Sequence, residues 1–301
     1  MADDKEETTD QVIIDKAKTK WGKFKQFIWN SEKKEFMGRT ALSWAKILVF
    51  YFVFFYPLLL AFWYSCMLVL MQTINDLKPK YMLDKSLIGT VPGLSYRPLP
   101  IILPNSMKSE VIWLHTNRSE TTKHWVSSLN TFLEPYFKQD GAVNCSSDQP
   151  TGRNRVCLVP VKGTCDQKNN YGYDNGKPCF LLKLNKIYGW YPKTFNDFPK
   201  DLKDNLQDPF EKDLVYVTCV GDTEEDKNNT GNVHYYPKQG IPSYYYPFTN
   251  QKGYLSPLVF VQFGNLKRGL VVLIRCRAHF QDINSKDSEH KTRVLIKLRI
   301  D

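Results

Sequence analysis

Residues that could carry out enzyme chemistry are present in this sequence, but not at the spacings that such chemistry needs. The histidines are His115, His124, His234, His279 and His290. They form no H-E-x-x-H motif, and none stands beside a cysteine pair of the zinc-ligand type. The chain also contains no G-x-S-x-G nucleophile motif and no phosphate-binding G-x-x-x-x-G-K-S/T loop. We therefore predict no catalytic residue, no bound metal and no cofactor.

The acidic run Glu224–Asp226 is the best candidate for a pair of catalytic carboxyl groups. A retaining glycosidase needs two carboxyl groups ~5 Å apart across a cleft. The run instead stands among lysine and asparagine, a composition typical of a solvated turn. We interpret it as part of a loop.

Cysteine shows a clearer pattern. Cys66 lies in a long apolar run, and the other six cysteines all follow that run. An even set on one side predicts three disulfides in an oxidising compartment, which leaves no thiol there as a nucleophile. Six cysteines permit fifteen pairings, and the residues alone do not choose among them. The sequential pairing is the simplest: Cys145 with Cys157, Cys165 with Cys179, and Cys219 with Cys276.

The apolar run predicts a membrane-spanning helix. Residues 47–71 carry no charge, and the charge-free stretch continues to Asn75. At ~1.5 Å per residue, these 25 residues would form a helix of ~37 Å, more than the ~30 Å hydrocarbon core of a bilayer. A signal peptide would be shorter, would start earlier and would end in a small-residue cleavage site.

The flanking charges predict the orientation of this helix. Nine Lys and Arg residues lie between Lys16 and Lys46, against three just after the span. The positive-inside rule then places the N-terminus in the cytoplasm and the rest of the chain outside, a single-pass type II topology. The N-glycosylation motifs agree, because all three follow the span: Asn117, Asn144 and Asn228.

The net charge of +10 would suit nucleic-acid binding in an intracellular protein, but the predicted extracellular location argues against such a partner. The basic residues beside the span could attract anionic lipid instead. Aromatic residues and lysines alternate over residues 21–40, which is typical of an amphipathic segment at the level of the lipid headgroups.

The C-terminal part predicts a mainly-β domain with one attached helix. Residues 121–137 place Trp125, Leu129, Phe132, Leu133 and Tyr136 on one helical face, and Pro135 should limit the C-terminal end of that helix. Strand-like runs rich in β-branched and aromatic residues cover residues 155–161, 179–185, 214–220, 257–263, 269–278 and 292–300. We expect an immunoglobulin-like β-sandwich with three disulfides, in which a Cys219–Cys276 bond would join the two sheets. The predicted organisation is a cytoplasmic tail (1–46), a transmembrane helix (47–75), an extracellular stalk (76–110) and the immunoglobulin-like domain (111–301).

The sequence resembles a known family. The segments "WNSEKKEFMGRT", "FYFVFFY", "YGYDNGKPCFLLKLNKIYGWYP" and "YYYPF…YLSPLVFVQFGNL" are similar to signature segments of the β subunit of sodium/potassium-transporting and hydrogen/potassium-transporting P-type ATPases. The resemblance runs from about Trp21 to the C-terminus. The sequence differs from the family pattern in two places. Pro57 stands where the family usually has glycines close by, and the aromatic stretch before Pro57 is one residue longer than usual.

The resemblance implies a non-catalytic, glycosylated plasma-membrane subunit that assembles with the catalytic α subunit. Such a subunit supports folding and membrane delivery of α and modulates potassium affinity and occlusion. The resemblance also implies the sequential disulfides, and it leaves room for a small single-span regulatory subunit as a further partner. By motif, Tyr51, Phe55 and Tyr56 would contact α within the membrane. Tyr244, Tyr245, Tyr246 and Pro247 would contact α outside the cell.

Three alternatives remain open at this point. A cell-adhesion or carbohydrate-binding type II membrane protein would also explain aromatic residues on a β domain, and aggregation of cells by the isolated ectodomain would favour it. The three tyrosines could instead fill the core of their own domain. A type II ectoenzyme is the third class, and it lacks a convergent set of catalytic residues.

Overall fold

The computed structural model describes residues 21–301, except residues 26, 32, 76–77, 101–110, 116–118, 162 and 284–285. The chain divides between residues 75 and 76 into two compact units. Residues 1–20 of the predicted cytoplasmic tail (1–46), and Asn117 of the first glycosylation motif, lie outside the described residues.

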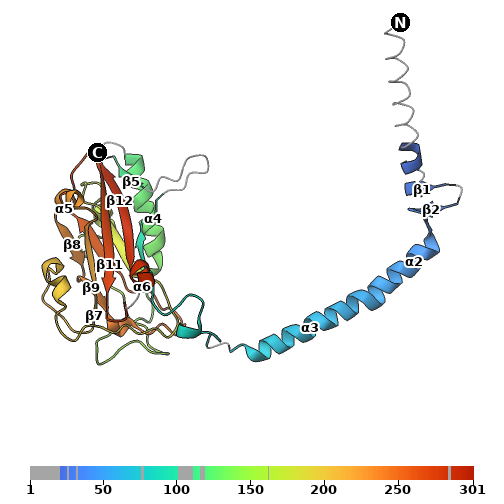
Figure 1. Cartoon of the computed structure of the whole chain (residues 1–301), viewed down its shortest axis with the longest axis horizontal. Coiled ribbons are helices and arrows are strands. Elements are labelled where there is room, and N and C mark those ends of the chain that lie inside the picture. The colour runs from blue at the N-terminus through green and yellow to red at the C-terminus, as the bar shows by residue number, and fades with distance from the viewer. Residues whose placement is uncertain are drawn as a thin grey trace, which may run out of the picture. The chain divides into compact units, whose positions relative to one another are not determined.

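The first unit consists mainly of one long apolar helix (Figure 1). It comprises α2 (Ala41–Val49), a π-helical turn η1 (Phe50–Phe55) and α3 (Tyr56–Thr73). Its 33 residues give a length of ~50 Å, and none of its side chains is buried within the chain. The helix is therefore long and apolar enough to cross a membrane. It begins six residues before Ile47 because the side chain of Thr40 caps its first turn, where it accepts a hydrogen bond from the Ser43 N–H.

Pro57 explains the π-helical turn. Proline has no N–H to donate, and in a regular helix its ring would meet the carbonyl group four residues earlier, at Val53. Widening the preceding turn relieves this contact, and the Tyr56 N–H accordingly bonds to the carbonyl of Tyr51, five residues earlier. A π turn absorbs one additional residue, which fits the extra residue in the aromatic stretch.

A small antiparallel sheet precedes α2. Its three two-residue strands are β1 (Trp29–Asn30), β2 (Glu35–Phe36) and β3 (Arg39–Thr40), in the order β1-β2-β3. We call the described residues between 29 and 40 (29–31 and 33–40) the β-meander. The Met37 N–H donates to the Ile28 carbonyl, and Trp44 in the first turn of α2 donates its indole N–H to the Phe36 carbonyl at 2.8 Å.

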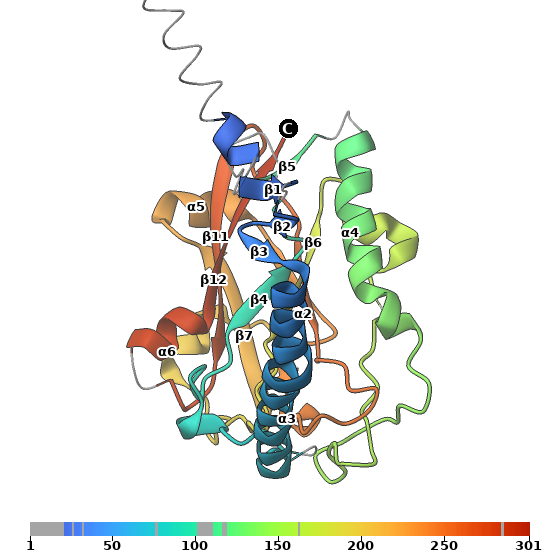
Figure 2. The ribbon, with the colours of Figure 1, turned by 90° about the vertical axis from the view of Figure 1, so that its right-hand side faces the viewer.

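The second unit is built on two β-sheets that share one hydrophobic core (Figure 2). The first sheet is antiparallel, in the order β4 (Leu94–Arg97), β6 (Cys179–Leu184), β10 (Val259–Phe263) and β8 (Val233–Tyr236). The second runs β5 (Val111–Leu114), β12 (Arg293–Ile300), β11 (Val271–His279), β7 (Leu214–Gly221) and β9 (Gly240–Pro242). In this second sheet, all pairs of adjacent strands are antiparallel except β5 and β12, which run parallel to each other.

Three helices complete this unit among the described residues: α4 (Ser119–Phe137), α5 (Glu224–Thr230) and α6 (Lys286–Lys291). Short 3-10 turns lie at η2 (Leu83–Lys85), η3 (Gln167–Gly172), η4 (Lys200–Asn205) and η5 (Ser243–Tyr245). Four of the five predicted core residues of α4 are buried, and Phe132 is partly buried. The helix continues past Pro135 because Tyr136 is buried and donates its hydroxyl to the Ser256 carbonyl at 2.9 Å.

Five of the six predicted strands are confirmed, and residues 155–161 are the exception. This segment makes an isolated bridge between Cys157 and Val143 but forms no strand. Pro160 cannot donate to a ladder, and the disulfide of Cys157 ties the segment to a loop. Part of the predicted stalk differs as well, because residues 94–97 form the edge strand β4.

The three disulfides have the sequential pairing: Cys145–Cys157, Cys165–Cys179 and Cys219–Cys276. The expected position of the third bond is wrong. Cys219 and Cys276 lie directly opposite each other on the neighbouring strands β7 and β11, with Cα atoms 4.0 Å apart. The bond therefore lies within one sheet rather than between two, and it does not support an immunoglobulin-like assignment.

Candidate functional site

The π-helical turn brings together three rings that were predicted to face a partner within the membrane. The ring of Tyr51 lies 5.3 Å from that of Phe55 and 6.4 Å from that of Tyr56, and Phe55 and Tyr56 are 5.7 Å apart. In a regular helix, residues five apart point in directions that differ by ~140°. The wider turn reduces this difference and places the rings of Tyr51 and Tyr56 side by side. All three side chains are exposed in the isolated chain.

We call Tyr244–Pro247 the tyrosine segment. Two of its four side chains are buried in the second unit, and the other two are partly exposed. Tyr245 and Tyr246 are only 6% and 5% exposed, whereas Tyr244 and Pro247 are partly exposed. The Tyr245 hydroxyl donates to the Leu158 carbonyl at 2.9 Å, and the Tyr246 ring packs edge-on against Trp190 at 5.1 Å. Burial raises the pKa of both tyrosines, so both remain neutral at physiological pH. Tyr245 and Tyr246 therefore lie in the core of their own domain, whereas Tyr244 and Pro247 are partly open to solvent.

An apolar hollow adjoins Tyr244. It has a volume of ≈ 240 Å³, and its lining includes Pro160, Pro237, Pro242, Tyr244, Tyr245 and Pro257. The segment beside it is held by a hydrogen bond of 2.8 Å from the Thr151 N–H to the Tyr244 carbonyl. Proline-rich walls lose little conformational entropy on binding, so the hollow suits an apolar side chain of another protein.

The glycosylation motifs differ in their surroundings. Asn144 is exposed and directly precedes the disulfide-bonded Cys145. Asn228 is exposed on α5, while Thr230 of the same motif is buried and donates its hydroxyl to the Asp226 carbonyl at 2.6 Å. Both asparagine side chains are therefore open to solvent.

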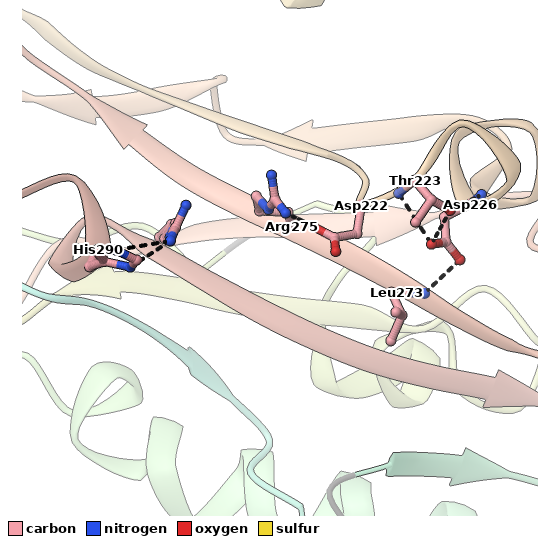
Figure 3. Close-up of polar contacts among 7 residues, drawn as sticks. Asp222, Thr223, Asp226, Leu273, Arg275 and His290 are labelled. Carbon is pink, nitrogen blue, oxygen red and sulfur yellow. Dashed lines mark hydrogen bonds and ion pairs between the residues drawn. The ribbon is translucent and has the colours of Figure 1, made fainter. Parts of the chain in front are cut away.

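The interpretation of Glu224–Asp226 as part of a loop is wrong. These residues form the first turn of α5, where Thr223 and Asp226 make a reciprocal capping box. The Asp226 carboxylate also accepts the Leu273 N–H of β11 at 3.0 Å, and the neighbouring Asp222 pairs with Arg275 (Figure 3). Desolvation raises the pKa of Asp226, but the hydrogen bonds from Leu273 and Thr223 outweigh it and leave that pKa below its ordinary value.

Asp226 therefore has a structural role at the start of α5. Across the part of the chain that the structure describes, no group of three or more His, Cys, Asp or Glu residues is arranged to hold a metal ion.

Among the described residues, one helix has the length and composition to cross a membrane, and it precedes a β domain with three disulfides; together these features define the class of single-span membrane proteins. Comparison with known proteins specifies the family. The model of the "Sodium / potassium ATPase beta chain" family matches residues 14–298, so the chain belongs to this family. It is a β subunit of the sodium pump, which is the non-catalytic subunit.

Relatives from insects and vertebrates are similar over most of their length. The sodium/potassium-transporting ATPase subunit beta-2 of Drosophila melanogaster is 39% identical over 298 residues, which cover 92% of this chain and 91% of the relative. Subunit beta-1 of the same organism is also 39% identical, over 88% of both chains. Human subunit beta-2 is 33% identical over 96% of this chain and 99% of the relative.

Proposed function

We propose that this chain crosses the plasma membrane once, with its N-terminus in the cytoplasm, and assembles with the catalytic α subunit. There it supports folding and delivery of α and modulates potassium affinity and occlusion. The basic excess before the helix and the disulfides after it support this topology.

The aromatic face of the helix is the observation that carries the proposed contact within the membrane. Tyr56 lies nine residues after Ile47, ~14 Å into the charge-free stretch, where a hydroxyl group needs a partner. Tyr51 and Phe55 pack beside it and enlarge the surface for a helix of α. The other sides of the helix contact lipid, and they leave room for a small single-span regulatory subunit.

Tyr244, Pro247 and the adjoining hollow form the proposed contact outside the cell. A half-exposed tyrosine beside an apolar hollow is a typical anchor of a protein interface. Tyr245 and Tyr246 support this surface from within the domain, because their burial fixes the backbone of the segment.

Co-purification tests the extracellular contact. The chain is co-expressed with a sodium-pump α subunit, extracted in mild detergent and captured through α. We expect Tyr244→Ala to weaken the association about thirtyfold, which is the typical cost of losing a central aromatic anchor. Tyr244→Phe should retain most of the association, because the ring supplies most of the buried area.

Leu295→Ala is the matched control, since Leu295 is an exposed apolar residue on β12. Equal recovery of α with Tyr244→Ala, Leu295→Ala and the unchanged chain would contradict the proposed contact. Potassium activation of ATP hydrolysis, measured on the same samples, reports on the proposed modulation.

A further inference from the structure

We propose that the β-meander is a docking site for the anionic lipid headgroups of the inner leaflet. The inference rests on the proposed topology, which places this segment in the cytoplasm. Its basis is the depth of the β-meander, its fixed attachment to the helix, and its combination of basic and aromatic side chains.

The β-meander is attached to the helix by several contacts and cannot swing far from the membrane surface. Trp44 in α2 donates its indole N–H to the Phe36 carbonyl at 2.8 Å, and the Trp44 and Phe36 rings lie 6.0 Å apart. Arg39 donates to the Ser43 hydroxyl at 3.5 Å, and Thr40 caps the helix. In Figure 1 the β-meander accordingly lies directly at the N-terminal end of α2.

The length of helix between the β-meander and the charge-free stretch sets its depth. Thr40 precedes Ile47 by seven residues, a rise of ~10 Å. The headgroup layer on each side of a bilayer is ~5–8 Å thick. This rise places Thr40 ~2–5 Å beyond the headgroup layer, within the ~8 Å over which the charge of the membrane surface acts at physiological ionic strength.

The side chains of this region suit an anionic lipid surface. From Trp21 to Lys46 the sequence has six basic residues and two acidic residues, a net charge of +4. Lys33 and Lys34 are exposed between β1 and β2. Trp29, Phe36 and Met37 are exposed beside them. Each lysine near an anionic membrane surface strengthens binding about fivefold, and aromatic rings prefer the headgroup level.

A partner protein is the competing occupant of this surface. A protein partner would require complementary acidic groups at one particular place, whereas an anionic leaflet surrounds the end of the helix on all sides. The position of the β-meander within reach of the charged membrane surface therefore favours lipid.

The test uses the full chain in nanodiscs, with Cys66→Ser removing the free thiol and Met37→Cys carrying an environment-sensitive fluorophore. Nanodiscs of phosphatidylcholine alone are compared with nanodiscs containing about one-fifth phosphatidylserine, and brominated lipids report contact by quenching. We expect phosphatidylserine to increase the quenching and the blue shift of the label, and 0.5 M salt to reverse that increase.

Lys33→Gln combined with Lys34→Gln should lower the ratio of docked to undocked β-meander about 25-fold in the phosphatidylserine nanodiscs. Lys78→Gln combined with Lys80→Gln removes the same charge beyond the other end of the helix and should leave the label unchanged. Quenching that does not change with phosphatidylserine, with salt or with the substitutions of Lys33 and Lys34 would overturn the proposal. Loss of quenching on addition of α would do so as well, because α would then be the occupant.

Recovery of α by the Lys33→Gln, Lys34→Gln variant separates this inference from the proposed function. If only the lipid site is wrong, α is recovered normally and the label shows no response to phosphatidylserine. If the proposed function is wrong, the unchanged chain fails to recover α, whatever the label shows.

Discussion

His279 is a partly buried titratable group on β11, in the five-stranded sheet of the second unit. Its Nε2 atom lies 2.7 Å from the hydroxyl of Thr218 on the neighbouring strand β7. Burial lowers the pKa of His279 to about 4, and the positive charge of Arg277, which is paired with Glu289, adds to that effect. The imidazole ring is therefore neutral in the folded protein at physiological pH.

We predict that the second unit loses stability as the pH falls from about 6.5 towards 4. Unfolded His279 takes up a proton near pH 6.5, whereas folded His279 does so only near its lowered pKa of about 4. Between these values the unfolded state binds more protons, so the free energy of unfolding decreases by up to ~1.4 kcal/mol per pH unit.

The measurement is thermal unfolding of the full chain in detergent, followed by tryptophan fluorescence between pH 4 and 7. His279→Gln should flatten the slope in this window, while His290→Gln, which changes an exposed histidine, should leave it unchanged. An unaltered slope in His279→Gln would show that other groups cause the acid sensitivity.

The tyrosine segment shows which structural features can be predicted from residue types and which cannot. The prolines and the three tyrosines made the segment recognisable as irregular and aromatic. The burial of Tyr246 depends on Trp190, which is 56 residues away in the sequence, and that of Tyr245 on the carbonyl of Leu158. Such long-range contacts follow from the topology, so the sequence could not distinguish Tyr244 from its two neighbours.

At the scale of elements, α5 depends on Asp226. This carboxylate caps the helix and also accepts an N–H group from β11, so it fixes the helix against the sheet (Figure 3). We predict that Asp226→Ala lowers the free energy of unfolding by about 2–3 kcal/mol, through loss of a helix cap and of a charged hydrogen bond. Asp226→Asn should cost less, since its amide oxygen can still accept one bond.

Glu225→Ala is the control for Asp226→Ala. It removes the same charge from the same turn of α5, but its side chain is exposed. Chemical denaturation of the full chain measures both variants. Equal midpoints for Asp226→Ala and Glu225→Ala would show that the capping contacts contribute nothing.

The elements that were predicted correctly have strong local signals. Strands such as β11 and β12 are long and alternate, and α4 has a clear apolar face. Strands β4, β5 and β9 have four residues or fewer, and they form because neighbouring strands supply hydrogen bonds and core contacts. The signal for α5 was present in the capping pair Thr223 and Asp226, but the helix is so polar that periodicity did not reveal it.

At the scale of the whole molecule, the disulfides differ in what they constrain. Cys219–Cys276 closes a separation of 57 residues, and Cys145–Cys157 one of 12. The loop-entropy model gives about 4 and 3 kcal/mol for the two bonds. The longer bond also lies in the centre of the five-stranded sheet, where both cysteines are buried.

We therefore predict that Cys219→Ala with Cys276→Ala lowers the melting temperature of the second unit more than Cys145→Ala with Cys157→Ala. The shorter bond lies near the tyrosine segment, since Cys157 Sγ is 3.7 Å from the Tyr244 carbonyl oxygen. Compared with removal of Cys219–Cys276, removal of Cys145–Cys157 should therefore cause the smaller loss of melting temperature but the larger loss in recovery of α. Thermal unfolding and co-purification, measured on the same two variants, check this difference. Parallel losses in both measurements would contradict it.

The position of β12 in its sheet has a consequence for biosynthesis. This strand follows all the others in the sequence, yet it pairs with β5 on one side and β11 on the other. Strand β5 cannot take its place in the sheet until residues 293–300 have been synthesised. In the proposed topology these residues must also pass through the translocon, so we expect a nascent chain stalled before Arg293 to keep an open sheet, to be held by chaperones of the secretory pathway and to be degraded instead of leaving the endoplasmic reticulum.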